Sequence, residues 1–115
     1  MQQKATVLVV DADLLGLARI EGAAARAERA VKVADASGLK DELPDVDLVI
    51  IDLDRGREAS LDALDAARSS GRLTARVILF VSHVDEALAQ RARERGYETF
   101  ARGRFWRSLD DLLNA

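Results

Sequence analysis

Short runs of β-branched and other apolar residues recur along the chain and alternate with segments rich in alanine, leucine, arginine and glutamate. Uninterrupted apolar runs of this length predict strands buried on both faces of a sheet, and the segments between them consist of good helix formers. The predicted strands are residues 6–10, 30–33, 46–51, 77–81 and 97–101. Strands that alternate with helices predict an α/β fold, a doubly wound five-stranded parallel sheet flanked by helices.

Helix boundaries follow from capping residues and helix breakers. A first helix is expected over 14–27 with Asp13 as its N-cap, and a short one over 37–43 that Pro44 ends. Further helices are expected over 60–69 and over 85–95, the latter ended by Gly96. The apolar face of a last helix is formed by Trp106, Leu109, Leu112 and Leu113.

Length and composition exclude several classes of protein. The 115 residues fit a single domain, 1–115, without a separate output domain, and the absence of cysteine excludes disulfides, thiolate catalysis and cysteine-bound metals. The net charge of −3 comes from 17 basic and 20 acidic residues spread along the chain, so no basic field for nucleic acid is expected. No apolar run approaches the roughly 20 residues of a membrane span. We expect a cytoplasmic protein that binds neither nucleic acid nor membrane.

Two of the predicted strands end on an aspartate, Asp11 after residues 7–10 and Asp52 after residues 48–51. The carboxyl ends of parallel strands line one crevice, so the two carboxylates are expected to lie near each other. Aspartates at strand ends also accept backbone N–H bonds or cap the next helix, and this structural alternative stays open. For Asp54 the alternative is a solvated loop residue paired with Arg55 or Arg57.

With these strand ends in this order, the chain resembles the receiver domain of bacterial response regulators, a CheY-like (flavodoxin-like) fold, over essentially its full length. Residues 7–11 resemble the first strand and its acidic end, 48–52 the third strand with the phosphoacceptor, and 77–82 the fourth strand. The resemblance implies phosphoryl transfer to Asp52, assisted by Mg²⁺. It places Asp11 at a metal-binding acid and Asp54 at the residue whose carbonyl binds the ion.

The chain departs from the receiver pattern at three positions. Ala12 stands where the family has the acid that binds the metal directly. Counted without gaps from Gly96, Val81 falls at the position of the phosphate-binding hydroxyl and Gly103 at that of the lysine. Because each lost donor commonly costs about 3–4 kcal/mol of transition-state stabilisation, we expect inefficient phosphorylation and at most weak Mg²⁺ binding.

Other residues are candidates to replace the missing groups. Ser82 would supply a hydroxyl if the strand slipped by one residue, and Arg102 or Arg104 would supply a positive charge, although a guanidinium is a poor copy of an ammonium. Phe100 falls where receivers carry the aromatic residue of their switch, but Val81 replaces its threonine partner. His83 is interpreted as a solvated loop residue.

We therefore interpret the chain as a stand-alone, atypical pseudo-receiver that acts in two-component or phosphorelay signalling by protein–protein interaction, without enzymatic activity or a cofactor. One alternative is a phosphorylatable single-domain receiver that uses Asp52 with Mg²⁺. Another is a phosphatase of the haloacid-dehalogenase type, because Asp52, Asp54 and Ser82 resemble the first motifs of that family. That family also needs a lysine in the crevice, and none follows Lys40.

The expected partner is a kinase, a scaffold or an output protein. The resemblance implies binding through the face formed by the helix over 85–95, the fifth strand and the last helix. A homodimer through this face is a further hypothesis, because the two helices carry opposite charges. The charged residues are Arg91, Arg93, Arg95, Asp110 and Asp111.

Overall fold

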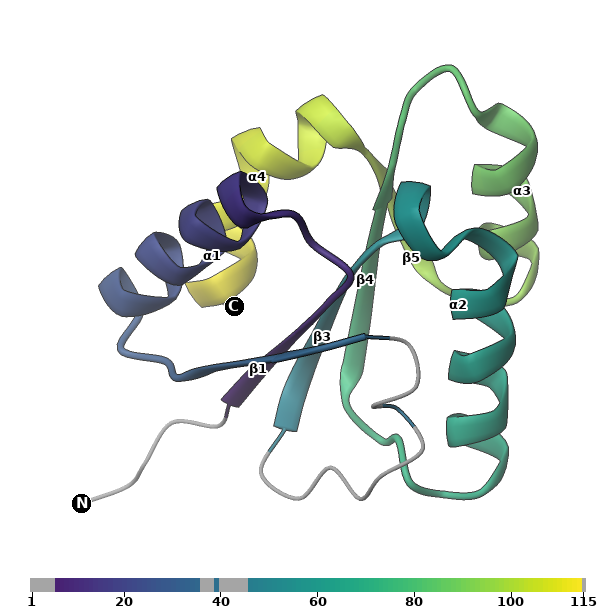
Figure 1. Ribbon diagram of the computed structural model, residues 1–115, viewed down its shortest axis with the longest axis horizontal. Helices are drawn as coiled ribbons and strands as arrows, with labels where there is room; N and C mark the ends of the chain where they lie inside the picture. Colours follow the sequence, from purple (N-terminus) through teal and green to yellow (C-terminus); the bar gives the residue numbers. More distant parts are fainter. Residues whose placement is uncertain (1–5, 36–38, 40–45, 115) are drawn as a thin grey trace.

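The computed structural model describes residues 6–35, 39 and 46–114 (Figure 1). The strands are β1 Thr6–Val10, β2 Val31–Ala34, β3 Val46–Asp52, β4 Arg76–Val81 and β5 Glu98–Ala101. The helices are α1 Leu14–Arg26, α2 Leu53–Ser69, α3 Glu86–Glu94 and α4 Arg102–Asn114. The short helix expected over 37–43 lies outside the described residues, apart from Leu39.

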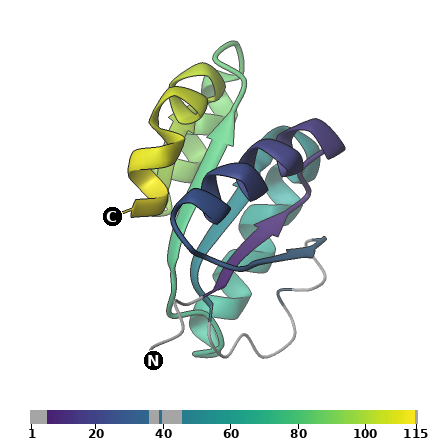
Figure 2. The same ribbon diagram turned by 90° about the vertical axis from the view of Figure 1, so that its left-hand side faces the viewer.

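All strand pairings are parallel, and the strand order is β2-β1-β3-β4-β5. This order confirms the predicted doubly wound sheet and is that of flavodoxin-like folds. Helices α1 and α4 cover one face of the sheet, and α2 and α3 cover the other (Figures 1 and 2). Because the strand order reverses between β1 and β3, their carboxyl ends flank the crevice where ligands of such sheets bind.

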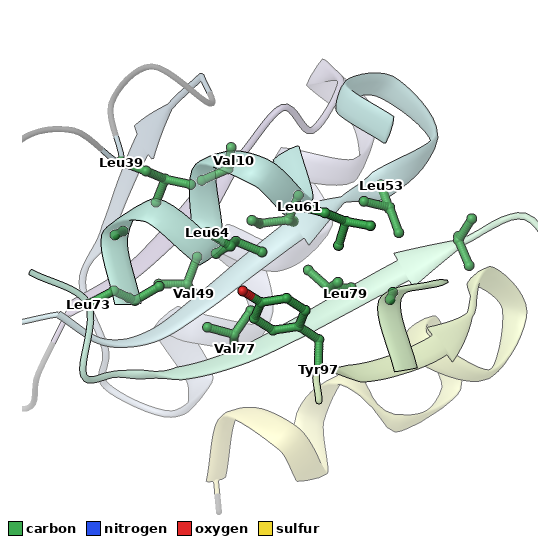
Figure 3. Close-up of a cluster of buried hydrophobic side chains, with 14 of the residues drawn as sticks. Val10, Leu39, Val49, Leu53, Leu61, Leu64, Leu73, Val77, Leu79 and Tyr97 are labelled. Carbon is green, nitrogen blue, oxygen red and sulfur yellow. The ribbon is translucent and has the colours of Figure 1, made fainter. Parts of the chain in front are cut away.

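Side chains that alternate along the central strands form two cores. Val7 and Ile50 point into the core beneath α1 and α4, whereas Val49 and Leu79 point into the core beneath α2 and α3. Figure 3 shows side chains of this second core, among them Tyr97. The Tyr97 hydroxyl donates a hydrogen bond of 2.6 Å to Asp65 on α2. Burial on both faces explains why these strands are continuous apolar runs.

The start of α2 differs from the prediction. The helix begins at Leu53, seven residues before the expected start, because the Asp52 side chain caps it and Leu53 is fully buried. A kink follows at Arg57, whose φ of 50° and ψ of −134° interrupt the helical backbone. The glycine and the charges of residues 54–58 predict a loop, whereas burial of Leu53 holds the segment in a helical turn.

Other boundaries agree with the prediction to within one or two residues. Asp13 caps α1, as predicted, by accepting a 2.7 Å hydrogen bond from the Gly16 backbone N–H. Asp85 caps α3 in the same way through Leu88. No helix in the described part of the chain is both long enough and apolar enough to cross a membrane.

Candidate functional site

The centre of the crevice is Asp52, at the carboxyl end of β3. The residue is only 3% exposed, and its Oδ1 atom accepts two hydrogen bonds. One comes from the Asp54 backbone N–H at 3.1 Å and closes the first turn of α2, and the other comes from Arg102 Nη2 at 2.7 Å. The proposed phosphoacceptor is therefore both a helix cap and one partner of a largely buried ion pair.

Arg102 joins Asp52 to Asp54. It is the first residue of α4, and its Nη2 atom lies 2.9 Å from Asp54 Oδ2 while its Nε lies 3.3 Å from the same oxygen. The guanidinium also lies over the Phe80 ring, 4.8 Å from its centroid. Burial alone would lower the pKa of Arg102, but the hydrogen bonds to Asp52 and Asp54 raise it, so the cation is stabilised in place.

The alternative that Asp54 is a solvated loop residue paired with Arg55 or Arg57 is wrong. Its two carboxylate oxygens accept the Ser82 backbone N–H, at 3.0 and 2.9 Å, and the same carboxylate holds Arg102. Neither Arg55 nor Arg57 forms its ion pair, and Arg57 instead pairs with Asp85 at 2.8 Å. We call Asp52, Asp54, Arg102 and the Ser82 backbone N–H the arginine lock. It connects β3, the start of α2, the end of β4 and the start of α4.

Asp11 lies at the end of β1 and belongs to a separate contact. Its Oδ2 atom accepts a long hydrogen bond of 3.5 Å from the hydroxyl of Ser60, a fully buried residue of α2. Gly56 permits this approach, since a Cβ there would lie 1.8 Å from Ser60 Oγ and 2.8 Å from Asp11 Oδ2. Ser60 and Gly56 were not predicted, and their spacing gives no signal for this contact, because the kink at Arg57 lies between them.

Burial raises the pKa of Asp11, and the charge of Asp35 adds to the increase. The charge of Arg55 and the Ser60 hydrogen bond oppose this effect, and the charge of Asp52 is the smallest of the contributions. Repulsion between the two strand-end carboxylates is therefore minor. Asp11 also has a left-handed backbone, with a φ of 63°, which aspartate tolerates better than most residues.

The residues present do not fit the magnesium site that the resemblance implies. Ala12 packs against the core beneath α1 and α4 and supplies no ligand. Asp52 and Asp54 are held by Arg102, and Asp11 by Ser60. Within the described ranges, no three histidine, cysteine, aspartate or glutamate side chains are grouped so that they could bind a metal.

The remaining predicted site residues lie around the arginine lock. Val81 is 1% exposed within the core, so it offers nothing to the crevice, and the Ser82 hydroxyl accepts the Val84 backbone N–H at 3.4 Å. Gly103, which sequence counting places at the lysine position, is exposed. Arg104 is also exposed and lies over the half-buried Phe100 ring, 5.9 Å from its centroid. Of the two candidate arginines, only Arg102 contacts the aspartates.

The predicted partner face contains pockets, but most of its charged residues are not free to pair across a dimer as predicted. One pocket of about 360 Å³ lies between the β4–α3 loop, α3 and β5, and includes the exposed His83. A second, also of about 360 Å³, lies along β5 and is bounded by Arg93 and Arg104. Most of the charges expected to meet across a dimer are paired within the chain. These pairs are Arg91–Glu58 at 2.7 Å, and Arg95–Asp62, Arg95–Asp65 and Arg26–Asp110, each at 2.9 Å.

Comparison with known proteins adds one likeness. No family model matches the sequence, and no curated protein matches it. The crystal structure of the pilus assembly protein CpaE from Caulobacter crescentus CB15 is similar, with a TM-score of 0.66 over 95% of this chain and 93% of that chain. The two sequences are 22% identical. A likeness at this level shows the fold, so the chain has a CheY-like α/β fold.

Proposed function

We propose that this chain is a receiver-like protein-interaction domain of a bacterial signalling pathway, in which Asp52 does not serve as an efficient phosphoacceptor. The observation that carries the proposal is the arginine lock: one guanidinium bridges Asp52 and Asp54, at 2.7 and 2.9 Å. The CheY-like fold and the position of Asp52 at the end of β3 support the relation to receivers.

The arginine lock opposes phosphoryl transfer in two ways. Asp52 Oδ1, one of the two carboxylate oxygens that would share the attack on phosphorus and the binding of the ion, already accepts from two donors. The guanidinium also contributes one of the two positive charges that a divalent ion would bring, and it pairs with Asp54 as well as with Asp52. A phosphoryl group on Asp52 would have to displace Arg102 from a largely buried pair, without a hydroxyl from Val81 or an acid from Ala12 to stabilise it.

The arginine lock ties the partner face to the centre of the sheet. Arg102 begins α4 directly after β5, so the ion pairs fix the start of α4 relative to β3 and β4. Among the described residues, Arg93 and Arg104 form no ion pair and bound the pocket along β5. We propose that a kinase, scaffold or output protein binds this face through an acidic segment. Because CpaE is named for pilus assembly, proteins of such a system are the first candidates.

The test is whether Asp52 accepts a phosphoryl group or its analogue. The protein is incubated with Mg²⁺ and beryllofluoride, or with a small phosphodonor, and its amide NMR spectrum is compared with that of Asp52→Asn. We expect no stoichiometric change that depends on Asp52. Arg102→Ala serves as the matched variant, because it frees the carboxylate without changing it.

A stoichiometric change in the wild-type spectrum that is absent from Asp52→Asn contradicts the proposal and favours the phosphorylatable receiver. Phosphatase turnover that disappears in Asp52→Asn favours the haloacid-dehalogenase reading instead. If only Arg102→Ala responds to beryllofluoride, the arginine lock is the element that prevents the reaction, as proposed.

A further inference from the structure

No described element covers the outer face of α1 (Figure 2), and this face carries exposed apolar residues. Leu14 is 86% exposed and Leu15 is 73% exposed, whereas the opposite face packs into the core through Ile20 and Ala23. The exposed leucines continue into small residues one and two turns later. At about 100° per residue, the centre of this outer face consists of Leu15, Ala18, Gly22 and Ala25.

These four positions have the spacing of a helix-pairing seam. Their separations of three, four and three residues match the a and d positions of a two-stranded coiled coil. Ala18, Gly22 and Ala25 have little or no side chain, so a second helix can approach the backbone closely. A Cβ at Gly22 would meet nothing nearer than the Arg26 guanidinium at 3.6 Å, so Arg26 is the side chain that borders this part of the face.

The two flanks of the seam carry opposite charges. Arg26 lies on one flank together with Arg19, whose guanidinium lies over the Trp106 ring, 4.3 Å from its centroid, and Glu21 lies on the other flank. Glu21 is exposed and forms no ion pair with a described residue. Arg26 pairs with Asp110, but both side chains are more than 60% exposed, and surface pairs of this kind contribute about 0–1 kcal/mol. Arg26 can therefore be shared with another carboxylate at little cost.

We propose that α1 pairs with α1 of a second copy of this chain, in parallel orientation about a two-fold axis that runs along the helices. Parallel pairing brings the flank of Glu21 against the partner's arginine flank, with Glu21 five residues before Arg26, the separation of charge pairs across parallel coiled coils. Antiparallel pairing would bring like flanks together. The face is thus complementary to itself in one orientation, as a two-fold contact requires.

This proposal is independent of the proposed function. It uses the outer surface of α1 and none of the residues of the arginine lock or of the pocket along β5. The phosphodonor assay can therefore fail or succeed without affecting it, and the dimer is measured by other means.

Disulfide trapping tests the geometry, because the chain contains no cysteine. Single variants Ala18→Cys and Ala25→Cys are oxidised at several protein concentrations. In the parallel pair each seam residue faces its own copy, so both variants are expected to give at least about fivefold more covalent dimer than a control. The control is Ala66→Cys, which replaces an exposed residue of α2. Trapping of either seam variant at no more than the control level overturns the parallel arrangement.

Sedimentation equilibrium of the protein without introduced cysteines measures how the apolar and charged residues contribute to dimer formation. Leu15→Glu and Glu21→Arg are each expected to raise the dimer dissociation constant at least about tenfold, while Glu21→Arg combined with Arg26→Glu restores it. Circular dichroism verifies that each variant folds, as expected for exposed positions. A wild-type protein that stays monomeric up to millimolar concentration overturns the proposal and leaves α1 as a site for another protein. Failure of the charge exchange to restore association overturns it as well.

Discussion

Replacing Arg102 by alanine removes the one side chain that joins Asp52 to Asp54. The substitution leaves a carboxylate that is 4% exposed without its cation, and it leaves Asp54 with only the Ser82 backbone N–H. The side-chain contact with the Phe80 ring is lost as well. We expect Arg102→Ala to destabilise the fold without changing its topology.

The size of the effect follows from the burial of the partners. Removing one member of a fully buried ion pair costs about 3–5 kcal/mol, and breaking an exposed pair costs about 0–1 kcal/mol. Arg102 is 35% exposed, and Asp52 keeps the backbone N–H of Asp54 at 3.1 Å. The discount for solvent screening gives an expected loss of about 2–3 kcal/mol in the free energy of unfolding, or roughly 10 °C in Tm.

Chemical denaturation followed by the fluorescence of Trp106 measures this loss, since it is the single tryptophan and it contacts the Phe80 and Phe105 rings. A double-mutant cycle with Asp52→Asn isolates the pair, and we expect a coupling energy of about 1–2 kcal/mol. Arg102→Lys is the matched control that keeps the charge but cannot bridge both carboxylates. A loss below about 0.5 kcal/mol for Arg102→Ala, with additive effects in the cycle, would show that the pair of Arg102 and Asp52 does not stabilise the fold.

Three further predictions concern other buried contacts. Asp11→Asn should be more stable than wild type at pH 7, because burial raises the pKa of Asp11 in the folded state. The wild-type protein then loses stability as the pH rises through that pKa. Urea titrations at several pH values should show that the difference between wild type and Asp11→Asn vanishes below pH 3.8. Gly56→Ala should cost about 1–3 kcal/mol, since its Cβ would enter the contact between Asp11 and α2. Gly103→Ala is the control: its Cβ would meet only Arg107 Nη1, at 3.5 Å, so this variant should gain about 0.5–1 kcal/mol in the same denaturation assay. Burial and the hydrogen bond to Asp65 raise the pKa of Tyr97 to about 12, so an ultraviolet titration should show no ionisation of Tyr97 near pH 10. The free energy of unfolding should fall as the pH rises from 10.0 to about 12, because the neutral hydroxyl is favoured in the folded state. Tyr97→Phe should cost about 1 kcal/mol at pH 7, and an unchanged unfolding midpoint would contradict that role for the hydroxyl.

The strands could be predicted because both faces of the sheet are covered, which makes each central strand a continuous apolar run. The cap at Asp13 was equally visible, since its hydrogen bond is local in sequence. The first turn of α2 could not be predicted, because residues 54–58 contain a glycine and four charged residues, which are typical of a loop. That turn depends on burial of Leu53 and on the cap at Asp52, and burial is decided by parts of the chain far away in sequence.

The candidate site shows the same division between topology and side-chain geometry. The parallel order of the strands sufficed to place Asp11 and Asp52 at one edge of the sheet. It did not show that Asp11 would bond to Ser60, or that Arg102 would reach a carboxylate 50 residues earlier. Counting along the chain places Gly103 at the position of the receiver lysine. Arg102 lies one residue nearer to β5, and its long side chain reaches Asp52 from there. Arg102 carries one positive charge, so it offsets one of the two carboxylate charges, and it does so as part of the chain, whereas a bound ion would do so reversibly. Under the proposed function, this difference separates a fixed binding surface from a switch.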